Sequence, residues 1–93
     1  MRINGQIKHL TVMFLIDSGS IHNFIVHSII KRLGYYLQFV PGVSVAVANG
    51  AKMVTHDICR AVKWETQGLQ QSTDFLVLPL RGCDVVLGVH WLK

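Results

Sequence analysis

One carboxylate in the sequence stands where it could do chemistry. The apolar run Phe14-Leu15-Ile16 leads directly into Asp17-Ser18-Gly19, so an acid, a hydroxyl and a glycine follow what reads as a buried strand. Removing a carboxylate from water is costly unless other groups compensate for it, so a strand that ends in an acid indicates a catalytic group or a turn. Asp-Ser-Gly is also an ordinary turn tripeptide, because Asp and Ser bond to local backbone and Gly accepts positive φ. Taken alone, the tripeptide favours the turn, and the rest of the chain has to decide.

The histidine and cysteine residues are weaker candidates. His56-x-x-Cys59 has the spacing of two metal ligands, but no second pair follows it nearby, so we expect no metal site. Cys59 and Cys83 could form one bridge, although free buried thiols are the better expectation without a secretory context. His22 is interpreted as a residue at the entry of a helix rather than as a base. The two tryptophans are expected in the core or in an interface: Trp64 and Trp91.

Composition limits the classes of protein that the chain can belong to. Its 93 residues are enough for one domain with a modest core, and 51% apolar with 15% charged residues exclude a disordered chain. The nine Lys and Arg residues are scattered and only Lys31-Arg32 are adjacent, so the net charge of +4 predicts no direct nucleic-acid partner. No apolar run approaches the about 20 residues that span a bilayer, and no signal peptide is recognisable. We therefore expect no membrane partner and a cytoplasmic setting.

The elements around Asp17 are predicted from periodicity. Asn4-Gly5 is a strong signal for a hairpin turn, and the strand that follows, Ile7 to Ile16, alternates apolar residues on one face. Its second face becomes apolar toward Asp17, which predicts that this end of the strand is buried on both sides. A helix is expected after Asn23 as N-cap, ending at Leu33 with Gly34 as a left-handed C-cap.

The second half of the chain is predicted to form a series of short strands. After a predicted turn at Pro41-Gly42, residues 43–48 alternate toward Asn49-Gly50, and a return strand starts at Ala51 and continues past Ile58. Gln67-Gly68 is expected to turn the chain again. Two apolar strands are predicted at 75–78 and 85–88, and a helix is expected to open at Val89. The pattern predicts a mostly β fold with a closed or sandwich-like core and one helix.

Several of these segments together resemble a known family. They match, in the family's order, the retropepsin-like aspartic proteases, in the variant found in gypsy-type retrotransposon polyproteins of plants. The flap region of that group is similar to 47–50, and its closing segments are similar to 74–80 and 84–92. The active-site segment of the group resembles Leu15-Ile16-Asp17-Ser18-Gly19-Ser20 followed by His22-Asn23-Phe24-Ile25.

The resemblance implies a small closed β-barrel with one short helix, active as a homodimer in which each protomer donates one Asp. It implies that Asp17 activates the water, that Ser18 bonds across the dimer, and that Gly19 lets backbone approach the carboxylates. Asp84 is interpreted as a structural carboxylate. The substrate would be an extended peptide of a retroelement polyprotein, without any cofactor or metal, and residues 1–93 would form one protomer, alone or as a segment of that polyprotein. The residues implied in substrate binding are Ser20, Ala48, Asn49 and Gly50.

Two other hypotheses about the function of the chain stay open. Ile21 stands where the family commonly has a polar residue such as Thr, and His90 where Gln or Asp is commoner. Ile21 and the short terminal segments favour a catalytically silent protease-like module that serves interaction or dimerisation. A small β domain unrelated to proteolysis is the third reading, in which the order of the matches would be coincidence.

Overall fold

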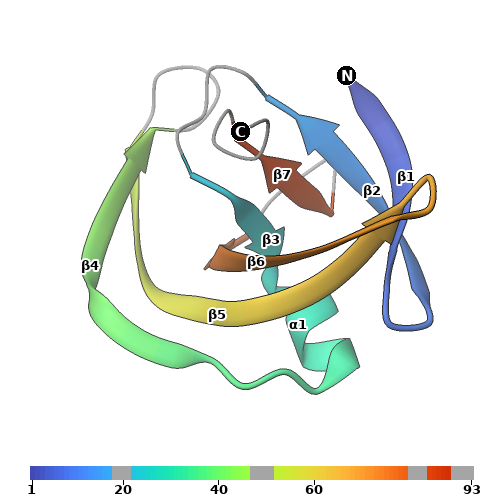
Figure 1. Ribbon diagram of the computed structural model, residues 1–93. Helices are drawn as coiled ribbons and strands as arrows, with labels where there is room; N and C mark the ends of the chain where they lie inside the picture. The colour runs from blue at the N-terminus through green and yellow to red at the C-terminus, as the bar shows by residue number, and fades with distance from the viewer. Residues whose placement is uncertain (18–21, 47–51, 80–83, 89–93) are drawn as a thin grey trace.

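The computed structural model describes residues 1–17, 22–46, 52–79 and 84–88 (Figure 1). Within these ranges the chain forms seven strands and one helix, which are β1 Arg2–Ile7, β2 Leu10–Ile16, β3 Phe24–Val26, α1 His27–Leu33, β4 Gln38–Ala46, β5 Lys52–Thr66, β6 Leu69–Leu78 and β7 Val85–Leu87. No helix in this part of the chain is long and apolar enough to cross a membrane.

The strands close into a barrel. They are hydrogen-bonded in the order β1-β2-β7-β3-β6-β5-β4, and a further pairing of β1 with β5 at Gln6 and Glu65 joins the two sides. Six strands therefore form the ring, and β4 extends it as an outer strand on β5. This arrangement confirms the predicted mostly β fold, a closed barrel with one short helix.

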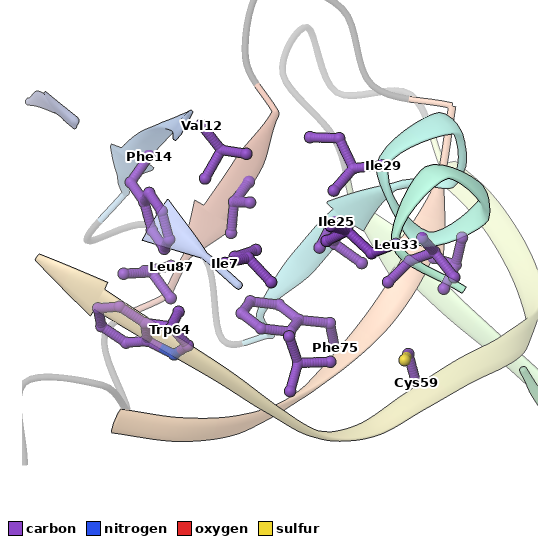
Figure 2. Packing of buried hydrophobic residues seen from close by; sticks show 14 residues of the cluster. Ile7, Val12, Phe14, Ile25, Ile29, Leu33, Cys59, Trp64, Phe75 and Leu87 are labelled. Atoms are coloured by element: carbon purple, nitrogen blue, oxygen red, sulfur yellow. The ribbon is translucent and has the colours of Figure 1, made fainter. Parts of the chain in front are cut away.

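Alternation along the strands fills the barrel with apolar side chains. Val12 and Phe14 of β2 and Val85 and Leu87 of β7 point inward, as period-2 strands require. Figure 2 shows Phe14 lying against Trp64, with ring centroids 5.0 Å apart and Trp64 only 2% exposed, so the predicted core position of Trp64 is confirmed. One face of α1 covers the core with three apolar residues: Ile29, Ile30 and Leu33.

The helix begins later than predicted. It starts at His27, and its N-cap position is Val26, which makes no side-chain cap. The predicted N-cap at Asn23 is wrong because 24–26 form a central strand that pairs with β6 on one side and β7 on the other. This segment is Phe-Ile-Val, a sequence that favours strands, so its backbone forms hydrogen bonds in the sheet and the helix begins only after it. The C-cap is confirmed, since Gly34 has φ 74° and donates its N–H to Ile30 O at 3.1 Å.

Two predicted turns are instead inside strands. Asn4-Gly5 lies within β1, and the chain turns after Ile7, where Lys8 has φ 57°. Gly5 is required there for a different reason: a Cβ would stand 2.7 Å from Phe14 Cε1 and 2.8 Å from Glu65 O. Pro41-Gly42 lies within β4 at a shift of register, which an outer strand tolerates because proline has no N–H to donate. The third turn, Gln67-Gly68, is confirmed.

A second apolar cluster lies on the other face of the sheet. Strands β4 and β5 form the predicted hairpin, paired up to Ala46 and Lys52, and its inner side packs against β2, β3, β6 and β7. Its tip and the helix predicted from Val89 lie outside the described residues. This group, called here the hairpin cluster, consists of Phe24, Val45, Leu76, Leu78 and Val86, with Leu15, Val43, Met53 and Ile58 packed around them.

Candidate active site

Asp17 is held by the end of β7. Strands β2 and β7 run parallel, with Ile16 opposite Leu87, and the main-chain N–H of Asp17 donates to Leu87 O at 2.9 Å. The prediction of a buried strand end is wrong, because Asp17 is exposed on the protomer and Ile16 is half-buried. The reason is that the strand pairing stops here, so the side chain leaves the barrel at its rim.

The end of β2 that leads into Asp17, called here the Asp17 stem, is paired on its other edge with the first residue of the chain. Ile16 donates its N–H to Met1 O at 2.7 Å, and the Met1 α-amino group lies 3.4 Å from Ile16 O. The residue before Asp17 is therefore bonded on one side, and Asp17 itself on the other. Two-sided pairing fixes the backbone from which the carboxylate projects.

Asp84 anchors the start of β7 to β2 and β3. Its Oδ2 accepts from Met13 N at 2.8 Å, and its own N–H donates to Met13 O at 3.2 Å. Its carbonyl oxygen accepts from Val26 N at 3.0 Å. These bonds agree with the structural role expected for this carboxylate.

Asn23, which the sequence analysis assigned as a helix cap, is bonded instead to the chain that follows β7. Its side-chain Oδ1 accepts from Gly88 N at 2.8 Å, and its main-chain oxygen accepts from Leu76 N at 2.9 Å. The partner of the side chain is 65 positions away in the sequence. No local pattern distinguishes this long-range bond from a helix cap, since Asn is a favoured residue for both.

The other residues predicted for the site lie outside the described part of the chain: Ser18, Gly19, Ser20, Ala48, Asn49 and Gly50. The structure does describe the elements that carry them. Leu15, two residues before Asp17, packs on the hairpin cluster, which also contains Val45 of β4. Figure 1 shows β2, β7 and β4 all ending at the upper side of the molecule, with α1 at the lower end. The Asp17 stem and the β4–β5 hairpin thus face a common apolar layer.

The predicted weak candidates are not brought together. Cys59 points into the barrel, and burial, with a smaller contribution from the charge of Asp74, raises the pKa of its thiol. His56 is exposed and stacks on Phe39, with ring centroids 5.3 Å apart. Three residues apart on a strand, His56 and Cys59 face opposite sides. Among the described residues no group of three His, Cys, Asp or Glu side chains could hold a metal ion, and Cys83 and Trp91 are outside this part of the chain.

A pocket of about 500 Å³ lies away from Asp17. It opens between β1 and the far half of the β5–β6 ribbon, where Lys8, Lys63 and Glu65 contribute to its wall. Glu65 is the one carboxylate in the lining, so the pocket offers no pair of carboxyl groups for hydrolysis. We do not assign the chemistry to it.

Comparison with known proteins gives a family and a fold. A family model described as retroviral aspartyl protease matches residues 4–93. EIAV protease complexed with the inhibitor HBY-793 is 20% identical, with a TM-score of 0.75 over 99% of this chain and 84% of that one. The retroviral protease-like domain of Ddi1 from Leishmania major is 18% identical, with a TM-score of 0.74 over 100% of this chain and 74% of that one. Simian foamy virus (mac) protease is 16% identical, with a TM-score of 0.64 over 99% and 94%. A search of curated protein sequences gave no significant match.

Proposed function

Because the chain belongs to the retroviral aspartyl protease family, we propose that it is an aspartic endopeptidase whose active form is a homodimer. The observation that carries this proposal is the position of Asp17, exposed at the rim of the barrel on a backbone bonded to Leu87. A carboxylate that is exposed at the rim, on a backbone hydrogen-bonded to the neighbouring strand, is suited to act as one half of a catalytic pair.

The second half has to come from another copy. Hydrolysis by this route needs one carboxylate as base for water and a protonated partner as acid, and two carboxyls about 3 Å apart share a proton. The chain holds five acids, and the other four stand elsewhere. Asp84 is bonded to Met13, Asp74 is bonded to Arg60 and Ala61, and the remaining two lie along β5. A two-fold axis through the rim would bring Asp17 against its mate.

The family motif supplies the remaining roles of this proposal. Ser18 bonds across the dimer and Gly19 allows close approach of backbone to the carboxylates. Ser20 and the hairpin tip contact the substrate, the tip through Ala48, Asn49 and Gly50. Closing the tip over the substrate would exclude water from the carboxylates.

The substrate that we propose is an extended peptide with apolar side chains near the cleaved bond. An extended chain can add to the hairpin by main-chain hydrogen bonds. The half-buried residues around the hairpin cluster would offer it an apolar wall: Leu15, Val43, Met53 and Ile58. We further propose that the peptide belongs to the polyprotein of a gypsy-type plant retrotransposon, in which residues 1–93 form one protease protomer acting in the cytoplasm.

The test is hydrolysis of an unstructured peptide library at mildly acidic pH by the wild type and by Asp17→Asn. Asp57→Asn is the matched control, because Asp57 lies on β5, which does not pair with β2. We expect turnover in the wild type and the control and none in Asp17→Asn. Turnover that survives in Asp17→Asn would remove the mechanism.

The same assay examines the dimer. If each site needs two chains, the activity per protomer rises with protein concentration until the dimer is saturated, and added Asp17→Asn protein inhibits the wild type. Sedimentation measured over the same concentrations should show the monomer–dimer transition. Activity independent of concentration in a strict monomer would contradict the shared site.

The second candidate function is a non-catalytic interaction or dimerisation module. It is favoured by the match over the whole chain to a domain described as protease-like, in Ddi1 from Leishmania major. This function predicts self-association or peptide binding without turnover, with no effect of Asp17→Asn on either.

A further inference from the structure

We propose that Asn23 is a positioning residue for Asp17, and this inference rests on the proposed function because it concerns the same site. Asp17 and Asn23 flank residues 18–22, the segment that contains most of the predicted catalytic motif. Asp17 donates its main-chain N–H to Leu87 O at 2.9 Å, and Asn23 accepts the N–H of Gly88 on its Oδ1 at 2.8 Å. Both ends of this segment are therefore bonded to consecutive residues of the chain as it leaves β7.

The side chain of Asn23 forms its hydrogen bond just beyond the end of the backbone pairing between β3 and β7. Strands β3 and β7 are antiparallel, with Phe24 opposite Val86 and Ile25 opposite Val85. Gly88 lies beyond the last of these pairs and is buried, so its N–H needs an acceptor. The amide oxygen of Asn23 provides one. It thereby extends the attachment of β7 to β3 as far as the residue after Leu87.

This bond bears directly on the orientation of the Leu87 carbonyl. The carbonyl of Leu87 and the N–H of Gly88 belong to one planar peptide unit. The N–H of this unit donates to Asn23, and its carbonyl oxygen accepts from Asp17. The two hydrogen bonds therefore hold one rigid group from both sides. Loss of the Asn23 acceptor frees this peptide unit to rotate, and with it the main chain from which the Asp17 carboxylate projects.

Asn23 is itself tied to a third strand. Its main-chain oxygen accepts from Leu76 N at 2.9 Å, at the point where β3 and β6 begin their parallel pairing. The side-chain amide of Asn23 thus projects from a backbone that is hydrogen-bonded to the sheet. A catalytic pair needs its carboxyls held to within about 0.5 Å, and hydrogen bonds from neighbouring residues supply such precision.

The experiment combines amide exchange with kinetics on four proteins: the wild type, Asn23→Leu, Asn23→Asp and Val62→Ala. Asn23→Leu keeps the size of the side chain and removes the acceptor, whereas Asn23→Asp keeps an acceptor oxygen. Val62→Ala removes core packing on β5, a strand that does not pair with β7, so it controls for general loss of stability. Exchange is followed residue by residue by NMR, and kcat and KM are measured on the best cleaved peptide.

We expect Asn23→Leu to lose about tenfold or more protection at the Gly88 and Asp17 amides, relative to barrel amides such as that of Val12. Its kcat should fall about tenfold or more with KM nearly unchanged, because the chemical step depends on the placement of Asp17. Asn23→Asp should recover most of both. Val62→Ala should lower protection evenly and leave kcat close to that of the wild type at temperatures where it is folded.

Two results would overturn the proposal. One is that the Asp17 amide exchanges in Asn23→Leu at the same rate as in the wild type. The other is that Asn23→Leu loses no more kcat than Val62→Ala does. If the wild type shows no turnover that depends on Asp17, the proposed function fails, and the exchange rates at Asp17 and Gly88 still decide the role of Asn23. If Asn23→Leu does not fold, Asn23→Ser, whose hydroxyl is too short to reach the same position, replaces it in each measurement.

Discussion

Asp17 and Leu87, far apart in sequence, are joined by a hydrogen bond of 2.9 Å from the main-chain N–H of Asp17 to the carbonyl oxygen of Leu87. The position of the candidate catalytic carboxylate is therefore set by β7 as well as by its own strand. Leu87 is fully buried in the barrel, so this bond couples the rim of the barrel to its core. Changes at the two ends of β7 should consequently alter the position of Asp17.

Asp84 at the start of β7 gives the first prediction. Asp84→Ala leaves the Met13 N–H without its acceptor, and we expect a loss of about 1–3 kcal/mol in the free energy of unfolding. Asp84→Asn keeps an oxygen at the same place and should lose less than half as much. Chemical denaturation of the two variants measures the difference, and equal losses would show that the bond to Met13 contributes nothing.

The second prediction concerns the close contact at Gly5. A methyl group there would overlap the ring of Phe14 and the carbonyl of Glu65, so Gly5→Ala should destabilise the protein by about 1–3 kcal/mol. Gly34→Ala is the control, because Gly34 has open space around it and only its positive φ of 74° opposes a side chain, at about 1–2 kcal/mol. Urea denaturation in which Gly34→Ala is the more harmful change would refute the overlap.

Lys8 links the β1–β2 turn to the end of α1. Its Nζ donates to Leu33 O at 2.9 Å and lies 4.5 Å from the centre of the Tyr35 ring. A cation at the C-terminal carbonyls of a helix is favourable, so Lys8→Met should cost about 0.3–1 kcal/mol at low salt and less at high salt. Lys63→Met serves as the exposed-lysine control. Thermal denaturation at two salt concentrations that shows the same shift in both variants would contradict this role.

Cys59 gives a prediction for alkaline pH. Burial, and secondarily the charge of Asp74, raises the pKa of its thiol in the folded state above the ordinary value of about 8.5. Above that ordinary value the unfolded chain loses the thiol proton while the folded chain retains it. The free energy of unfolding should therefore be undiminished by this group below about pH 8.5 and fall as pH rises further.

The measurement is the slope of stability against pH from 8 to 10.5 in a Cys83→Ala background, so that Cys59 is the one remaining thiol. Adding Cys59→Ala should flatten the slope, because the group that titrates is gone. A slope unchanged by Cys59→Ala would show that other groups account for the alkaline loss.

Much of the fold was predictable because it rests on local alternation. The apolar periodicity at Val12 and Phe14, and the uniformly apolar segments around Val77 and Val86, predicted strands that the structure contains. The left-handed cap at Gly34 was equally local, since a single residue type satisfies it. These features depend on neighbours a few positions away, and so they can be read from the chain itself.

The errors have a common cause in contacts between distant segments. Asn4-Gly5 has the composition of a turn, but the glycine serves the close approach of Phe14 and Glu65. Asn23 has the composition of a helix cap, but its amide bonds to Gly88. In both places a long-range contact uses a residue whose local preference suggested something else.

The sequence by itself determined that this is a mostly β chain with one helix, and it singled out Asp17 through an ordered set of motifs. Only the tertiary structure decided which strands are neighbours, that β1 meets β5 to close the barrel, and that Asp17 stands exposed beside the end of β7. The physical reason is that periodicity records which side of a strand is apolar but does not name the strand that covers it. Pairing and burial are properties of the whole packed barrel, in which each hydrogen-bond partner is supplied by a distant part of the chain.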